Sequence, residues 1–268
     1  MIAVETTKSA DGTVIAYDWT GEGPALIVAL GAFCDRKSFV PPESLTSVFT
    51  VYTYDRRGRG DSGDTQPYSV EREIEDLAAV VAVASVASAG SSGSSGGPVF
   101  VYGHSSGAAL ALRAAAAGVP IARIVAYEAP FIVPGSRPVA DDPGPRIREM
   151  VEAGRRGDAV RYWMTDVVQA PPGVLARMEG SPMWAGLEAL THTLPYDIEL
   201  TAGQGIPADL LATITVPVLV VGGGKSPGSI PTFLRTSVAQ RRLDRCHVIM
   251  PDASLISCLR TPVSRART

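Results

Sequence analysis

The chain of 268 residues carries 27 acidic and 24 basic side chains, which gives a formal net charge of −3. This balance lacks the excess of Lys and Arg that neutralises phosphates, so we expect no nucleic-acid partner. Hydrophobic residues make up 46% of the chain and charged residues 19%, a composition typical of a globular domain. A chain of this length can bury one sizeable core, and we predict a single domain over residues 1–268.

Cysteine usage and the N-terminal sequence bear on compartment and partners. Cys34, Cys246 and Cys258 form neither a disulfide framework nor a CxxC metal pair, which favours a reducing cytoplasm and predicts no metal. Residues 1–18 carry charges and no uninterrupted apolar run, so no signal peptide is expected. No stretch approaches the ~18 apolar residues of a membrane span, and no nucleotide-binding glycine motif is present. We therefore expect neither a membrane partner nor a cofactor.

Short apolar, β-branched runs alternate with helical segments along the chain. This rhythm predicts a mostly parallel sheet with helices on both faces. An opening hairpin is expected first, with strands at 2–6 and 14–19 joined by the turn dipeptide Asp11-Gly12. The further strands are expected at 25–30, 49–54, 99–102, 124–127 and 216–221.

Helical segments are expected between and after these strands. Ser69 has the side chain of a helix N-cap, and the apolar pattern behind it continues to Val86. The alanine-rich residues 108–117 predict a second helix, and the Ser- and Gly-rich residues 88–97 predict a loop. At about 134–212 the strand rhythm gives way to helix-like segments, which we interpret as a lid inserted into the domain. Its aromatic and methionine side chains either pack the lid onto the core or line a substrate pocket.

Residues 103–107 read Gly-His-Ser-Ser-Gly, the most specific functional motif of the chain. The motif follows a predicted buried strand and opens a predicted helix, which is the context of a G-x-S-x-G nucleophile elbow. Such a turn is tight and strained, so it needs small neighbours, and Gly103, Gly107 and Ala108 supply them. The N-terminus of the helix would also stabilise developing negative charge. We therefore predict that Ser105 is a nucleophile.

With this elbow, the chain resembles the α/β-hydrolase superfamily over roughly residues 13–240. A second motif at 54–63, Tyr-Asp-Arg-Arg-Gly-Arg-Gly-Asp-Ser-Gly, is similar to the family's D-x-R-G-x-G-x-S turn after the fourth strand, whose role is mainly structural. The resemblance implies an α/β-hydrolase fold, in which a mostly parallel central sheet has helices on both faces and a helical lid. It also implies a small-molecule substrate, while the oligomeric state is left open.

The resemblance further implies an oxyanion hole made of backbone N–H groups. In the family, the loop after the third strand supplies one donor, often within a His-Gly-x sequence, and Leu30-Gly31-Ala32 matches it here. The expected donors are therefore the N–H groups of Ala32 and Ser106. Leu in place of His leaves them intact, because the main chain makes the contacts. Phe33 is expected near the mouth of the pocket.

A serine nucleophile needs a base, and the chain has three histidines. In the family the base follows the last strand, but here that strand is expected at 247–250 and no histidine follows it. His104 adjoins Ser105 and is expected to shape the pocket, while His192 in the lid is placed to reach toward it. His247 would lie about 15 Å from the catalytic edge of the sheet, given the rise of a strand. The base is left open among the three.

The acid that would orient this base is also displaced from its commonest place. Residues 222–227, after the penultimate strand, carry no carboxylate. Glu128 ends the strand that follows the elbow helix, a position from which some family members supply the acid. We take Glu128 as the first candidate and Asp197 in the lid as the second.

Three functions fit these residues. The first is a serine hydrolase that acts on a small ester, lactone or related acyl substrate through Ser105. The second is a catalytically impaired hydrolase-fold protein that binds a small hydrophobic ligand; it is favoured by the missing histidine and by the tail at 255–268, which lacks the amphipathic period of the family's closing helix. The third is a cofactor-free lyase or peroxidase-like enzyme, because one fold hosts many chemistries.

Overall fold

The computed structural model describes residues 4–88, 96–131, 142–170, 172–201, 205, 207–222 and 246–249. These residues form one eight-stranded sheet in the order β1-β2-β4-β3-β5-β6-β7-β8. The strands are β1 (Glu5–Lys8), β2 (Val14–Thr20), β3 (Ala25–Ala29), β4 (Thr50–Tyr54), β5 (Val99–His104), β6 (Arg123–Tyr127), β7 (Val218–Val221) and β8 (Cys246–Ile249). β2 runs antiparallel to β1 and β4, and every pair from β4-β3 to β7-β8 is parallel. The expected mostly parallel sheet is confirmed.

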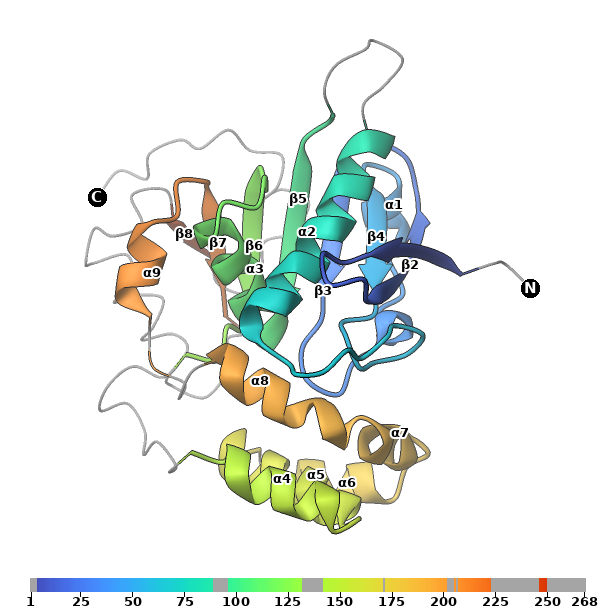
Figure 1. Ribbon diagram of the computed structural model, residues 1–268, viewed down its shortest axis with the longest axis vertical. Helices are drawn as coiled ribbons and strands as arrows, with labels where there is room; N and C mark the ends of the chain where they lie inside the picture. The colour runs from blue at the N-terminus through green and yellow to red at the C-terminus, as the bar shows by residue number, and fades with distance from the viewer. Residues whose placement is uncertain are drawn as a thin grey trace.

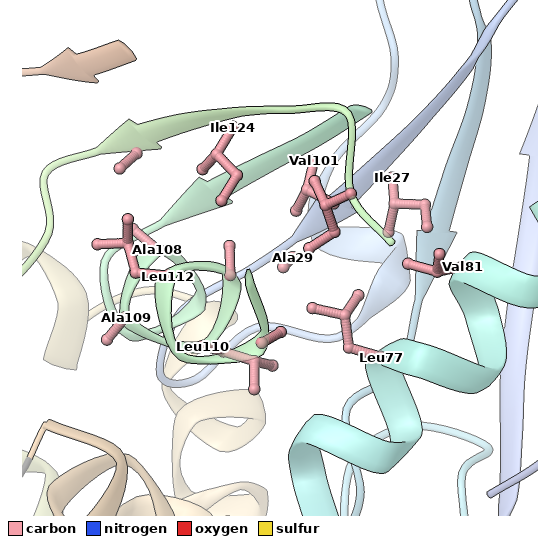
Figure 2. Packing of buried hydrophobic residues seen from close by; sticks show 14 of the residues in the cluster. Ile27, Ala29, Leu77, Val81, Val101, Ala108, Ala109, Leu110, Leu112 and Ile124 are labelled. Atoms are coloured by element: carbon pink, nitrogen blue, oxygen red, sulfur yellow. The ribbon is translucent and has the colours of Figure 1, made fainter. Parts of the chain in front are cut away.

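Helices cover this sheet in a way that follows from its apolar faces. α2 (Val70–Ala87) and α3 (Ser106–Ala116) pack on one face, and the short α1 (Glu43–Thr46) lies on the other with the loop that precedes it. All five residues of β3 are buried, because a central parallel strand is covered on both faces. Figure 2 shows the packing on the first face, where Ile27 and Val101 from the sheet meet Leu77 of α2.

A separate group of helices lies beyond the C-terminal ends of the strands (Figure 1). It contains α4 (Gly144–Glu152), α5 (Arg156–Tyr162), the π-helix η2 (Trp163–Val167), α6 (Pro172–Glu179), α7 (Met183–Ala189), the 3₁₀ helix η3 (Thr191–Thr193) and α8 (Leu194–Thr201). α8 lies between the sheet and helices α4, α5 and α6 of this group. α9 (Ala208–Ala212) instead contributes the buried Leu211 to the core beside α3. We call the segment from α4 to α8 the helical cap.

The predicted elements can be compared with the observed ones. The strands expected at 25–30, 49–54, 124–127 and 216–221 are found within two residues of their predicted ends, and Ser69 caps α2 by accepting from the N–H of Arg72. β5 is two residues longer than predicted, because its ladder with β6 continues to His104. Most of the loop expected at 88–97 and the whole tail at 255–268 lie outside the described residues. In the described part of the chain, no helix combines the length and apolarity needed to cross a membrane.

Candidate active site

Ser105 occupies a strained turn between β5 and α3. Its φ of 55° and ψ of −124° are unusual for a residue with a side chain, and such conformations cost about 1–3 kcal/mol each. The turn is held in place because the N–H of Ser105 donates to the carbonyl of Tyr127 on β6, at 2.9 Å. The turn therefore places Ser105 directly after the C-terminal end of β5, a central strand of the sheet.

Three glycines allow the backbone to close around this serine. A Cβ added to Gly103 would lie 2.5 Å from Cα of Ala108, and one added to Gly107 would overlap the carbonyl oxygen of Ala29. The start of α3 therefore packs directly on the ends of β5 and β3. On the other side of the nucleophile, a Cβ on Gly31 would lie 2.8 Å from Cβ and 3.2 Å from Oγ of Ser105.

The close approach at Gly107 predicts a loss of stability on substitution. We expect Gly107→Ala to lower the free energy of unfolding by about 1–3 kcal/mol, because α3 must move away from β3 to admit the methyl group. Urea denaturation measures the loss. Gly186→Ala in α7 is the matched control, since a Cβ there meets nothing within 4 Å. A Gly107→Ala protein as stable as the wild type would contradict the packing described here.

The expected oxyanion donors lie on the two segments that flank Ser105. Gly31 lies so close to Ser105 that an added Cβ would meet it at 2.8 Å, and Ala32 follows Gly31, while Ser106 is the first residue of α3. An N–H in the first turn of a helix has no acceptor within that helix, so the N–H of Ser106 is available to a substrate oxygen. The structure thus brings the segments of Ala32 and Ser106 to the two sides of Ser105.

Phe33 joins this loop to the helical cap. Its ring meets that of Trp163 edge to face, with 6.1 Å between ring centroids and 87° between planes. Both Ala32 and Phe33 pack against a buried apolar cluster that the cap supplies, made of Ile147, Trp163, Val167, Leu194 and Ile198. The loop after β3 therefore borders an apolar surface, which suits the hydrocarbon part of a small molecule.

Buried charges lie behind the two flanking segments. Nη1 of Arg56 lies 3.2 Å from the carbonyl oxygen of Leu30, 3.1 Å from Oγ of Ser106 and 2.9 Å from Oδ1 of Asp197, while its Nε binds Glu73 at 2.5 Å. Each of these four side chains, Arg56, Ser106, Asp197 and Glu73, is at most 3% exposed. We call Arg56, Arg59, Glu73 and Asp197 the charge cluster.

Asp197 is the residue that links the charge cluster to α8. Both of its carboxylate oxygens accept from Nη2 of Arg59 at 2.9 Å, and Oδ1 also accepts from Oγ of Ser106 at 2.6 Å. Burial alone would raise the pKa of Asp197, but Arg59 and Arg56 hold it below its usual range. Asp197 is thus an ionised partner of arginines, and the structure does not bring a histidine ring to it among the described side chains. The sequence made Asp197 the second candidate for the acid, and that role stays a prediction.

Glu128 directly follows β6 and has a left-handed φ of 52°. Its N–H donates to the carbonyl of Val221 on β7 at 2.9 Å, so the pairing between β6 and β7 continues to this residue. The carboxylate is close enough to His104 and Tyr102 to influence the pKa of each. The structure therefore places Glu128 near the end of β5, on the same edge of the sheet as Ser105.

The three histidines have different surroundings. The ring of His104 lies beside that of Tyr127, with 5.6 Å between centroids. Nε2 of His192 lies 2.8 Å from the carbonyl oxygen of Gly58, and its Nδ1 lies 3.0 Å from that of Ala189. Each ring nitrogen of His192 thus lies within hydrogen-bond distance of a backbone carbonyl, and a neutral imidazole donates to one of the two. The contact with Gly58 ties η3 to the turn after β4.

His247 is the second residue of β8, where the prediction put it at the start of the strand. It is level with Leu219, two residues before the level of Val221 and Ile249. β8 is also the third strand from β5, or about 14 Å away at the usual strand spacing. This backbone position is distant from Ser105.

The burial of His104 predicts a pH effect on stability. Burial lowers its pKa from the ordinary 6.5, although Glu128 opposes the shift. As the pH falls below 6.5 the unfolded chain binds the proton first, so the stability that this group contributes above pH 6.5 is lost on acidification. We expect the free energy of unfolding to fall less between pH 7.5 and 5.5 in His104→Phe than in the wild type, as measured by urea denaturation. Equal losses in the two proteins would contradict the shift.

The described residues contain no group of three or more His, Cys, Asp or Glu side chains arranged to hold a metal ion.

Sequence reasoning recognised the turn after β4 as structural but missed the burial of its arginines. The signal was local: three arginines within four positions directly follow a buried strand.

Comparison with known proteins gives a consistent result. Residues 26–258, well over half of the chain, match the family described as the alpha/beta hydrolase family. An alpha/beta hydrolase from Sphaerobacter thermophilus is 44% identical, with a TM-score of 0.83 and 93% of each chain covered. An enol-lactonase from Burkholderia xenovorans is 20% identical, with a TM-score of 0.63 over 94% of this chain and 93% of that one. An esterase from a Rhodococcus species is 18% identical, with a TM-score of 0.60 over 93% and 90%. At these lower identities the likeness is one of fold.

Proposed function

The chain belongs to the alpha/beta hydrolase family, and from that premise we propose that it is a serine hydrolase acting on a small ester, lactone or related acyl substrate through Ser105. The observation that carries the proposal is the conformation of Ser105, which is strained between β5 and α3. A residue with a side chain at a positive φ persists only where its surroundings impose it, and such strain concentrates at functional sites. A binding protein has no evident need for it.

The chemistry would proceed by acyl transfer. Oγ of Ser105 attacks the carbonyl carbon, and the carbonyl oxygen becomes an oxyanion that accepts hydrogen bonds from the N–H groups of Ala32 and Ser106. A base takes the serine proton and returns it to the leaving oxygen, and water then cleaves the acyl-enzyme. We propose that Glu128 orients this base, since it lies on the same edge of the sheet as the nucleophile.

The substrate class rests on the surroundings of the nucleophile and on the comparisons. The wall formed by Phe33, Trp163 and their neighbours favours a small apolar acyl group. Proteins of similar fold include an enol-lactonase and an esterase, both of which cleave a bond between an acyl carbon and oxygen. These two lines support esters and lactones over charged or polymeric substrates.

The positions of the histidines favour a second function, the binding of a small hydrophobic ligand without turnover. Both ring nitrogens of His192 face backbone carbonyls at hydrogen-bond distance, and His247 lies on the distant strand β8. If His104 also serves only to pack against Tyr127, Ser105 has no base among these three. The proposed hydrolase and this alternative therefore differ in one property, the reactivity of Ser105.

Labelling with a fluorophosphonate probe, followed by intact-mass detection, tests that property. We expect one adduct per chain in the wild type and none in Ser105→Ala. The single variants His104→Gln, His192→Gln and His247→Gln would then identify the base by their loss of labelling. A folded wild-type protein that takes no label would contradict the hydrolase and support the ligand-binding function.

A further inference from the structure

The two expected oxyanion donors come from segments that are far apart in the sequence. Ala32 follows β3, whereas Ser106 begins α3, and their spacing must be correct for both to bind one oxygen. The main-chain ladder alone does not fix this spacing, because Ala32 lies three residues beyond the end of β3. Some other contact must hold the loop against the helix.

The charge cluster supplies that contact from beneath. On the loop side, Nη1 of Arg59 donates to the carbonyl of Gly31 at 2.6 Å, and Nη1 of Arg56 lies 3.2 Å from the carbonyl oxygen of Leu30. These carbonyls belong to the two residues immediately before Ala32. The peptide unit that carries the N–H of Ala32 is the one whose carbonyl Arg59 binds, so Arg59 orients that donor directly.

On the helix side, the same cluster holds Ser106. Its hydroxyl donates to Oδ1 of Asp197 at 2.6 Å and lies 3.1 Å from Nη1 of Arg56. Asp197 completes the connection, because it also binds Nη2 of Arg59 through both carboxylate oxygens. A continuous path of hydrogen bonds therefore runs from one donor segment through Arg59 and Asp197 to the other.

The path is rigid for physical reasons. Arg56, Arg59 and Asp197 are each no more than 2% exposed, so water does not compete for their hydrogen bonds. Charge-assisted bonds of this kind are shorter and stronger than neutral ones, and their geometry is set by the flat guanidinium groups. Two arginines face Asp197 and Glu73, so the positive charge of the pair is balanced inside the cluster.

We propose that Asp197 is a positioning residue which, with Arg59 and the hydroxyl of Ser106, sets the spacing of the Ala32 and Ser106 oxyanion donors. The inference rests on the proposed hydrolase function and deepens it. Because Asp197 belongs to α8, which packs against α4 of the cap, the placement of the cap and the geometry of the oxyanion hole are coupled. A shift of α8 would release the hydroxyl of Ser106 and would leave Arg59, which holds the carbonyl of Gly31, without its carboxylate partner.

The test measures the kinetics of fluorophosphonate labelling in Ser106→Ala, Asp197→Asn and the wild type. The phosphoryl oxygen of the probe occupies the oxyanion hole during attack, so the maximal labelling rate reports on the donors and the half-saturating concentration reports on probe binding. Ser106→Ala keeps the backbone N–H and removes the hydroxyl, together with its contacts to Asp197 and Arg56. We expect both variants to lower the maximal rate about 10-fold with unchanged half-saturation, less than the ~10²–10³ that follows loss of a donor.

Asp76→Asn is the matched control, because Asp76 is equally buried and pairs with Arg57, outside the charge cluster. It should lower thermal stability and leave the labelling rate unchanged. A wild-type maximal rate in Ser106→Ala would overturn the inference even if Asp197→Asn failed to fold, and so would an equal slowing in Asp76→Asn. In either case, labelling of the wild-type protein would still support the hydrolase function. A wild-type protein that takes no label would overturn the hydrolase function and the positioning inference together.

Discussion

Gly31→Ala should lower kcat/KM for hydrolysis of a p-nitrophenyl ester about 10²-fold, the scale on which a small misplacement of reacting groups acts. A Cβ at this position would lie 2.8 Å from Cβ and 3.2 Å from Oγ of Ser105, so either the nucleophile or the loop must shift. The backbone of Gly31 is not in the left-handed region, so alanine itself is allowed there and the effect comes from the contact. The loop that shifts is the one that carries the N–H of Ala32.

Gly173→Ala in α6 serves as the control for this experiment, since its added Cβ would approach only the side chain of Arg177, at 3.9 Å. That variant should keep wild-type kcat/KM. Circular dichroism and a thermal melt would show whether Gly31→Ala remains folded. Wild-type activity in a folded Gly31→Ala protein would contradict the close approach of this loop to the nucleophile.

The sheet and the tight turn at Ser105 could be predicted because their signals are local. A central parallel strand is buried on both faces and is apolar throughout, as β3 is, so its limits can be read from the residues themselves. The turn at Ser105 needs small residues at fixed positions near it, and Gly103 and Gly107 each lie two positions from Ser105 in the chain. Neither inference requires knowledge of distant contacts.

The charge cluster could not be predicted, because its partners are far apart in sequence. Arg59 and Asp197 are separated by 138 positions, and no periodicity in the chain connects them. The same limit applies to His192, whose bond to the carbonyl of Gly58 spans 134 positions. The distance of His247 from Ser105 depends on the register of β8 against β7, and this register cannot be read from the residue types. Residue type alone leaves all these roles open.

Asp76→Ala should lower the free energy of unfolding by about 3–5 kcal/mol, the range for breaking a buried ion pair by removing one partner. Nε and Nη2 of Arg57 each bind a carboxylate oxygen of Asp76 at 2.7 Å, and both side chains are fully buried. The remaining acidic partner of Arg57 is Asp11, at 3.1 Å. Urea denaturation at pH 7 measures the loss, and a loss below ~1 kcal/mol, as for an exposed pair, would contradict it.

The double variant Arg57→Met/Asp76→Leu separates the worth of this ion pair from the damage done by stranding one charge. Replacing a buried pair with apolar side chains of similar volume is often close to neutral, because the desolvation of both ions is avoided. Arg57 also donates to the carbonyl of Arg72 at 3.0 Å, a bond that Met cannot replace. We therefore expect the double variant to be more stable than Asp76→Ala and less stable than the wild type. A double variant no more stable than Asp76→Ala would show instead that the ion pair itself stabilises the fold relative to apolar side chains.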